Sequence, residues 1–352
     1  QKQASLCYKK LSMSKKNSIV LNHKNCFSSY EQISKIYFNF RKKILALKRN
    51  KFLVAVSGGP DSLALAAMCK VLETNNKKKK FYYIHINHGI RKNSIIESER
   101  VKKILKKQHI LLKILNNKKK ITNNIQHNAR KVRYSLLNDE CKKKKISLIL
   151  MGHHKDDQIE TFLIRLSRGS GIQGLSAMSL TSCLNNKTKI FRPFLNENKK
   201  NLILITEKVF GTYIKDPSNY DKKFLRSNIR KLLPMLNKYG IGNDQIIRSI
   251  NNLKSSNKTL DMYFKEMFKK LVKQKGKKIS IKKYDFFSLN EELQMKILGS
   301  VIKLLNKLDY PPRSRKILTA LKFLNSTKDV KHQLGGCQLK SKNNYLYVEK
   351  TL

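Results

Sequence analysis

The sequence predicts an α/β protein with a doubly wound, mostly parallel sheet, followed by a C-terminal helical or α+β substrate-binding domain. Short apolar runs alternate with segments of helical periodicity through the first two thirds of the chain, which is the pattern of parallel strands joined by right-handed crossovers. Polar motifs follow several of these runs, at the strand ends where such sheets bind ligands. Beyond about Gly240 the pattern changes to long helices and a final meander of short strands.

The chain of 352 residues is long enough for two domains and carries a formal net charge of +53. This charge implies a polyanionic partner, most simply a nucleic acid. Lysine, asparagine and isoleucine are all abundant, so part of the charge can reflect the base composition of the gene. The arginines are more informative, because a planar guanidinium suits bidentate contacts. Eight of them lie in motif stretches, namely Arg91, Arg130, Arg133, Arg165, Arg168, Arg192, Arg226 and Arg230.

The sequence favours a soluble protein of a cytoplasmic-type compartment, with an organelle stroma left open. The six cysteines are scattered without a CxxC pair, which is typical of reduced thiols rather than of a disulfide or zinc framework. The sequence shows neither an apolar run of membrane length nor a signal-peptide pattern. We expect a tail at 1–28, an α/β domain at 29–240 and a C-terminal domain at 241–352.

The expected elements of the α/β domain follow one another in a regular order. They are helix 30–47, strand 53–56, helix 62–72, strand 81–86, helix 94–108, strand 110–115, helix 124–141, strand 146–151, a last strand that 191–194 enter or extend, and helix 199–210. His85 alternates with apolar residues and is expected to pack in the core. In the C-terminal part, we expect helices over 245–273, 289–308 and 314–324, a strand at 278–284 and the final meander.

The strongest motif is LVAVSGGPDSLAL at 53–65. Its turn contains Ser57, two glycines (Gly58 and Gly59), Pro60 in the first helical turn, Asp61 and Ser62. Glycine lets the backbone approach a ligand closely, and the N–H groups of a helix start favour an anion. The turn lacks the lysine of the common phosphate loop and the spacing of the dinucleotide fingerprint. A plain turn before a helix is the structural alternative.

A second motif, GHHKDDQIET, follows the strand at 146–151. Asp156 and Asp157 open a helix, where carboxylates also act as caps, and Glu160 lies one turn further on. Such hard oxygen ligands suit Mg²⁺ bound together with phosphates. The adjacent His153 and His154 do not match the spacing of a zinc-protease site.

Further motifs lie on both sides of these two. HINHGIR covers 85–91, Arg130 and Arg133 share a predicted helix, and the glycine-rich GSGIQGL at 169–175 follows Arg165 and Arg168. The stretch DPSNYDKKFLRSNIR at 216–230 starts with a turn and leads into a helix that we expect Pro234 to break.

The motifs SGGPDS, HINHGIR, GHHKDDQIET and DPSNYDKKFLR occur in this order within 57–226, and together they resemble the tRNA(Ile)-lysidine synthetases of the PP-loop ATP pyrophosphatase superfamily. The resemblance implies an enzyme that adenylates the wobble cytidine of a CAU-anticodon tRNA(Ile) with ATP and Mg²⁺, and then ligates free L-lysine to C2. It implies that 29–240 is the ATP-binding catalytic domain and that 241–352 binds tRNA. A homodimer is left open.

The resemblance also implies roles for individual residues. Ser57, Gly58, Gly59, Pro60, Asp61 and Ser62 would bind the phosphates of ATP, and Asp61 would also lie near Mg²⁺. Arg130 and Arg133 would stabilise charge on the phosphoryl group or hold the flipped base. Asp157 and Glu160 would bind the lysine ammonium or accept its proton. Arg226 would contact a phosphate or a carboxylate.

Two other functions remain open from the sequence. A PP-loop tRNA thiolase would need cysteine pairs for an iron–sulfur cluster or a persulfide, and the absence of CxxC in the sequence argues against it. A basic RNA-binding protein with a relic loop would not hydrolyse nucleotides at all.

Overall fold

The computed structural model describes residues 27–28, 30–90, 93–117, 121–215, 225–308, 310–326 and 329–351. The chain divides into two compact units, Gln1–Asn251 and Asn252–Leu352. Of the expected tail at 1–28, only residues 27–28 belong to the described residues. Among the described helices, none combines the length and the apolar character needed to cross a bilayer.

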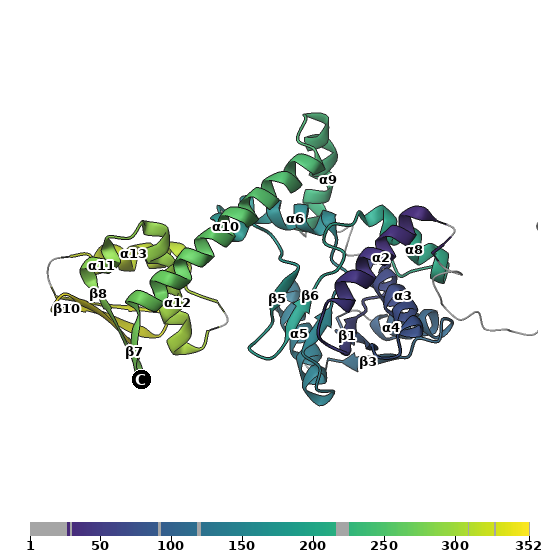
Figure 1. Cartoon of the computed structure of the whole chain (residues 1–352), viewed down its shortest axis with the longest axis horizontal. Coiled ribbons are helices and arrows are strands. Elements are labelled where there is room, and N and C mark those ends of the chain that lie inside the picture. Colours follow the sequence, from purple (N-terminus) through teal and green to yellow (C-terminus); the bar gives the residue numbers. More distant parts are fainter. Residues whose placement is uncertain are drawn as a thin grey trace, which may run out of the picture. The chain divides into compact units, whose positions relative to one another are not determined.

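The first unit contains a six-stranded sheet with the order β3-β2-β1-β4-β6-β5 (Figure 1). The strands are β1 (Lys51–Ala55), β2 (Lys80–Asn87), β3 (Leu112–Asn116), β4 (Leu148–Leu150), β5 (Thr181–Cys183) and β6 (Lys189–Phe191). All neighbours pair in parallel except β5, which runs antiparallel to β6. The chain moves outward from β1 to β3 and then places β4 on the other side of β1, which confirms the doubly wound fold.

Alternating side chains of the strands build one hydrophobic layer on each face of the sheet. Phe52 and Val54 of β1 belong to the larger layer, whereas Leu53 between them belongs to the other. Successive side chains of a strand point to opposite faces, so the continuous apolar run of β1 serves both. The larger layer is completed by α2 (Glu31–Leu45), α3 (Pro60–Asn75), α4 (Ser94–Lys106) and α8 (Lys199–Phe210). On the opposite face, α5 (Ile125–Lys143) supplies Leu137 and Cys141.

A further set of helices encloses a small apolar cluster in the same unit. It comprises α6 (Lys155–Leu166), α7 (Ile172–Leu175), α9 (Leu225–Lys238) and the beginning of α10 (Asn243–Leu271). Ile159 of α6 and Ile250 of α10 are fully buried in this cluster, and Leu233 of α9 packs against it.

Several local features differ from the sequence prediction, and two of them are instructive. The edge strand β5 was not predicted, because its three residues are half-buried or exposed and carry no apolar run. Helix α9 continues through Pro234, so the predicted break is wrong. A proline removes one backbone hydrogen bond of a helix, but α9 continues past it, and the turn before Pro234 is held by the burial of Ile229 and the packing of Leu233.

The second unit combines an antiparallel sheet with helices (Figure 1). Its strand order is β7-β8-β11-β10-β9, so the predicted meander also pairs with the earlier strand β8. The strands are β7 (Lys273–Lys275), β8 (Lys278–Lys282), β9 (Val330–Leu334), β10 (Cys337–Lys342) and β11 (Tyr345–Lys350). The end of α10, α11 (Lys283–Phe287), α12 (Glu291–Asn306) and α13 (Ser314–Leu324) share a core with this sheet that includes Phe286, Ile297 and Leu339.

Replacement of Thr206 tests how α8 supports the start of α3. The Thr206 hydroxyl is fully buried and donates to the carbonyl oxygen of Pro60 at 2.7 Å. Thr206→Val keeps the shape but leaves that carbonyl without its partner, so we expect a loss of about 1–2 kcal/mol in the free energy of unfolding. Urea denaturation measures the loss. Thr74→Val, at an exposed position of α3, is the control and should change stability by less than about 0.5 kcal/mol.

Candidate active site

The two strongest motifs begin at the carboxyl ends of neighbouring strands. Leu53 and Val54 of β1 pair in parallel with Ile149 and Leu150 of β4. The chain turns outward from this pair in opposite directions, so the site lies at the switch point of the sheet, where doubly wound folds bind ligands.

The turn after β1 forms a tight loop closed by Ser62. The hydroxyl oxygen of Ser62 accepts hydrogen bonds from the N–H groups of Ser57 at 3.1 Å and Gly58 at 3.2 Å, and it donates to the carbonyl of Gly59. Gly58 has a φ of +92°, and a Cβ there would lie 2.5 Å from Val101, so only glycine fits. Gly59 provides no side-chain cap for α3. The first N–H groups of α3 are therefore left to bind an anion.

Asp61 lies in the first turn of α3 with an unusual carboxylate. Its Oδ1 is buried and has no hydrogen-bond partner among the described residues. The backbone of Asp61 also approaches the second motif, because a Cβ on Gly152 would lie 2.6 Å from the Asp61 carbonyl oxygen. Gly152 thus allows the two motifs to touch.

The second motif starts α6 with His154 as the N-cap. Its Nδ1 accepts from the N–H of Asp156 at 3.2 Å, and the carboxylate of Asp157 accepts from the N–H of His154 at 3.0 Å. Burial lowers the pKa of His154, but Asp61 and Asp157 outweigh this effect and raise it above its ordinary value. Burial raises the pKa of Asp157, but His154, His153 and the N–H bond outweigh it and hold the pKa below its ordinary value. Asp157 is therefore ionised.

Glu160 is buried and already has partners. Nε of Arg230 donates to its Oε1 at 2.5 Å and NH2 of Arg230 donates to its Oε2 at 3.3 Å. Nε of Arg226 lies 3.9 Å from Oε2. Glu160 has only 2 % of its surface exposed, so this ion pair joins α6 to α9 and leaves Asp157 as the carboxylate better able to receive a ligand.

Arginines gather on the other side of the site without a carboxylate partner in the part of the chain that the structure describes. The guanidinium groups of Arg130 and Arg133 lie 4.8 and 5.5 Å from the ring centre of Tyr134. Arg192, after β6, donates to the carbonyl of Ser179 and the hydroxyl of Ser182. The Nε atoms of Arg133 and Arg192 are buried without a hydrogen-bond partner among the described residues. Each of these two N–H groups still lacks an acceptor in this part of the chain.

Two histidines next to this cluster are held neutral. Burial, with Arg133 and His85 in support, lowers the pKa of His88 to about 4. Burial also lowers the pKa of His153 to about 3, and the neighbouring arginines add to the effect although Asp157 opposes it. His85 is a packed core residue, as predicted, since its ring nitrogens contact the Val56 carbonyl at 2.9 Å and the Ser98 hydroxyl at 3.0 Å.

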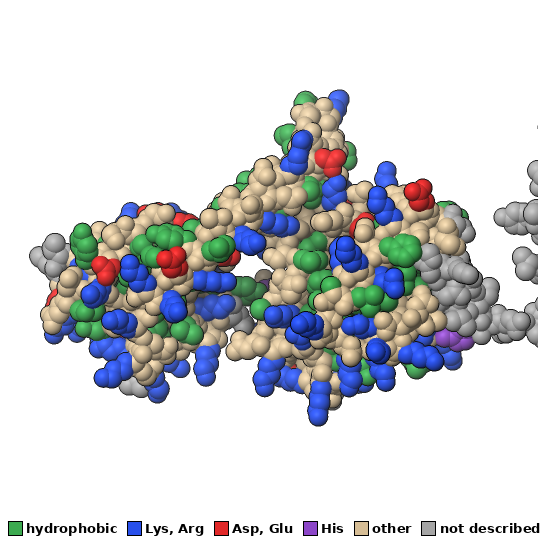
Figure 2. All heavy atoms as spheres, viewed as in Figure 1, with side chains coloured by type: hydrophobic (Ala, Val, Ile, Leu, Met, Phe, Trp, Pro, Cys, Tyr) green, Lys and Arg blue, Asp and Glu red, His purple; other side chains and the backbone are tan. Residues whose placement is uncertain are grey.

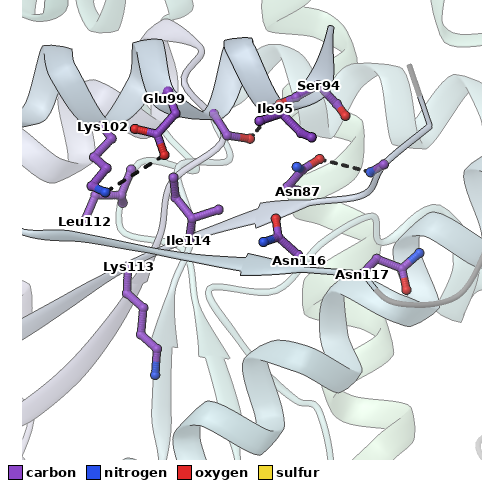
Figure 3. A pocket seen from close by; sticks show the side chains of 12 residues that line it. Asn87, Ser94, Ile95, Glu99, Lys102, Leu112, Lys113, Ile114, Asn116 and Asn117 are labelled. Carbon is purple, nitrogen blue, oxygen red and sulfur yellow. Dashed lines mark hydrogen bonds and ion pairs between the residues drawn. The ribbon is translucent and has the colours of Figure 1, made fainter. Parts of the chain in front are cut away.

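A pocket of about 620 Å³ opens beside the carboxyl ends of β2 and β3. Figure 3 shows Asn87, Asn116 and Asn117 at these strand ends, below Ser94 and Glu99 of α4. Its lining mixes amide and hydroxyl groups at the strand ends with aliphatic side chains and with three charged residues, namely Glu99, Lys102 and Lys113. Such a lining suits a ligand with both apolar and polar parts.

The structure brings most of the predicted residues together. Asp61 and Asp157 both approach His154. Glu160 of α6 lies near Arg226 of α9. Arg130 and Arg133 lie close enough to His153 to affect its pKa. Arg165 instead fastens the glycine-rich loop by donating to the carbonyls of Gly174 and Ala177.

Some predicted residues cannot be placed, and some site residues were not predicted. Arg91 and 216–224 lie outside the described residues. Sequence reasoning did not give a site role to His154, Arg192 or Arg230. Local signals for these residues do exist. His154 stands directly before the KDD helix start, Arg192 follows a strand end, and Arg230 lies one turn from Arg226.

The site fits the phosphates of a nucleotide better than it fits a bare metal ion. The uncapped start of α3 suits bound phosphates. The Asp61 oxygen that lacks a hydrogen-bond partner among the described residues lies at the same helix start. Among the described residues, no group of three histidine, cysteine, aspartate or glutamate side chains could hold a metal by itself. Asp61 would supply one hard oxygen ligand to Mg²⁺, and the phosphates would supply others.

Comparison with known proteins first gives the class of this fold and site. A family model of the PP-loop domain matches residues 29–236, so this is a member of the PP-loop proteins, which use ATP. A solved U34-tRNA thiolase from Methanococcus maripaludis with its [4Fe-4S] cluster shares the fold, with a TM-score of 0.53 at 20% identity over 63% of this chain and 79% of that one.

The sequence relatives then give the family. The chain is 34% identical to the tRNA(Ile)-lysidine synthase of Wolbachia pipientis wMel over 301 residues, which cover 84% of this chain and 69% of that protein. It is 38% identical over 242 residues to the enzyme of the same name from Buchnera aphidicola, covering 66% of this chain and 53% of that protein. The chain belongs to the tRNA(Ile)-lysidine synthase family.

Gly152→Ala should damage the loop after β1 without unfolding the sheet. The new Cβ would meet the Asp61 carbonyl at 2.6 Å, so the start of α3 must shift. We expect ATP turnover to fall at least tenfold and circular dichroism to stay unchanged. Gly171→Ala, where a Cβ meets nothing within 4 Å, is the control; equal activity of the two variants would contradict this account of the contact.

Stability should depend on pH through His88 and His153. Between pH 6.5 and about 4 the unfolded chain takes up protons that the folded rings do not, so the free energy of unfolding falls as the pH falls through this window. The slope is at most about 1.4 kcal/mol per pH unit for each ring. His88→Gln should flatten the change between pH 6.5 and 5 in urea denaturation. The exposed His127→Gln should leave it as in the wild type.

Proposed function

We propose that this chain modifies the wobble position of tRNA(Ile) with a CAU anticodon. Lysine is ligated to C2 of the wobble cytidine, through an adenylated cytidine, while ATP is converted to AMP and pyrophosphate. The product, lysidine, changes the codon read from AUG to AUA. The proposal is carried by two features near the switch point of the sheet. One is the uncapped helix start beside the Asp61 carboxylate, and the other is a cluster of arginines that have no carboxylate partner among the described residues.

The first step needs charge stabilisation on phosphoryl oxygens. ATP supplies the adenylyl group, to which the C2 oxygen of the cytosine bonds as pyrophosphate leaves. The N–H groups at the start of α3 bind phosphate oxygens, and Arg130 and Arg133 face the growing negative charge or hold the flipped base. Mg²⁺, bound by Asp61 together with the phosphates, would neutralise part of that charge. These donors are fixed before reaction, so they cost little reorganisation.

The pocket beside β2 and β3 suits the nucleoside part of ATP. It adjoins α4, whose Val101 packs against Gly58 of the loop. The amides of Asn87, Asn116 and Asn117 offer both donors and acceptors to a base or a ribose.

The second step needs a neutral lysine amine close to C2. The ionised Asp157 binds the lysine ammonium and accepts its proton, and the amine then bonds to C2 as AMP leaves. Glu160 acts mainly through its ion pair with Arg230, which sets the position of α9. Arg226 of that helix contacts a phosphate or the lysine carboxylate. Free lysine is thus the proposed second substrate.

The tRNA would contact both units through their basic surfaces. Figure 2 shows many Lys and Arg side chains and few Asp or Glu side chains on the visible face of each unit. The charge of +53 favours a long polyanion over a small one. We assign tRNA binding beyond the anticodon to residues 241–352. A homodimer and a cytoplasmic location remain predictions of the sequence.

Asp61→Ala should abolish conversion of ATP to AMP and leave tRNA affinity within about twofold of the wild type. The carboxylate is aimed at the phosphates, whereas RNA binding depends on the basic surface. AMP formation by chromatography and tRNA binding by filter retention measure the two effects. Asp139→Ala, which removes an exposed carboxylate of α5, is the matched control. Retained AMP formation in Asp61→Ala would overturn the assignment of the loop.

Binding of tRNA should weaken steeply with salt. Each phosphate contact on duplex RNA is expected to contribute about −0.9 to the log–log slope of affinity against salt concentration, by analogy with duplex DNA. Titrations between 50 and about 200 mM salt should therefore give a slope of several units. A flat response would mean that the positive charge is only solvated surface.

A further inference from the structure

His154 occupies a position between the two motifs that its capping role does not explain. It has 2 % of its surface exposed, and its Nε2 lies 3.6 Å from Oδ1 of Asp61 and 3.5 Å from Oδ2 of Asp157. Its other ring nitrogen accepts the N–H of Asp156. Because Nδ1 accepts a hydrogen bond, the ring proton sits on Nε2, between the two carboxylates.

The two carboxylates converge on this one side-chain donor, although Asp157 also accepts the backbone N–H of His154 at 3.0 Å. Oδ1 of Asp61 is buried and lacks any closer hydrogen-bond partner among the described residues. Asp157 is nearly buried and is ionised. Two negative groups that converge on one point repel each other unless a donor lies between them. The Nε2–H group of His154 is placed to be that donor.

The choice of residue supports a role beyond the helix cap. Asparagine is among the best N-cap residues, because its short side chain reaches the N–H groups of the first turn. The same chain uses asparagine in this way at α12, where Oδ1 of Asn290 accepts the N–H of Leu293 at 3.0 Å. Histidine is a poorer cap, but it adds a second nitrogen that points away from the helix. Only that nitrogen reaches Asp61.

We propose that His154 is a positioning residue that orients Asp61 toward the ATP phosphates and Asp157 toward the lysine amine at the same time. The proposal rests on the proposed function for the roles of these two carboxylates. It makes the two steps of the reaction depend on one imidazole, although the residues that it serves lie on different motifs. His154 itself need not touch a substrate.

Two substitutions separate the helix cap from the contact of Nε2 with Asp61 and Asp157, which we call the bridge. His154→Asn keeps a cap oxygen but loses the atom that reaches Asp61. His154→Gln keeps a donor at the reach of Nε2 but loses a good cap. We therefore expect the two variants to rank differently in stability and in activity. The Asn variant should be as thermally stable as the wild type, and the Gln variant should be less stable. In AMP formation and lysine incorporation the wild type should be fastest, the Gln variant slower and the Asn variant slowest. Asn should lower both rates at least tenfold and raise the KM for lysine.

The outcomes are distinct. An Asn variant with wild-type rates, or a Gln variant no more active than Asn, would show that His154 is only a cap. The exposed His127→Asn is the control and should match the wild type. Failure of the wild type to form lysidine would overturn the proposed function, not the bridge. The bridge is then tested by the rise in melting temperature that ATP and Mg²⁺ cause in each variant. The rise must be smaller for the Asn variant than for the Gln variant, and an equal rise overturns the bridge.

Discussion

The candidate site depends on the parallel pairing of β1 with β4. Only two residue pairs are in register, Leu53 with Ile149 and Val54 with Leu150, yet they place two loops from opposite halves of the sheet side by side. All four residues are fully buried. Their side chains belong to the hydrophobic layers on the two faces of the sheet. The pairing therefore positions the loops without using any polar side chain of the site.

The electrostatics follow from this geometry. Carboxylates cluster around His154 and α6, whereas guanidinium groups cluster around Tyr134 and the end of β6. Neutral His88 and His153 lie beside the arginines, because burial and nearby positive charge make protonation costly. The site therefore offers both carboxylate and guanidinium groups to a ligand, although the ion pair of Glu160 with Arg230 lies on the carboxylate side.

Much of this arrangement could be predicted from local sequence, and the limits have physical reasons. The strands and helices of the sheet, the loop at 57–62 and the helix start at Asp156 and Asp157 show themselves through periodicity, glycine and caps. The bridge by His154 and the pairing of Glu160 with Arg230 could not, because both arise from contacts between segments far apart in the chain. Helix α9 shows a related limit, since it continues through Pro234 to Lys238 while Leu233 packs against a cluster from distant segments.

The most direct test is incorporation of lysine into RNA. The chain is incubated with ATP, Mg²⁺, labelled lysine and tRNA(Ile) carrying a CAU anticodon, beside the same tRNA with uridine in place of the wobble cytidine. The account predicts label in the CAU tRNA alone, with one AMP formed for each lysine incorporated. Formation of AMP without label in the RNA, or equal labelling of both tRNAs, would contradict it.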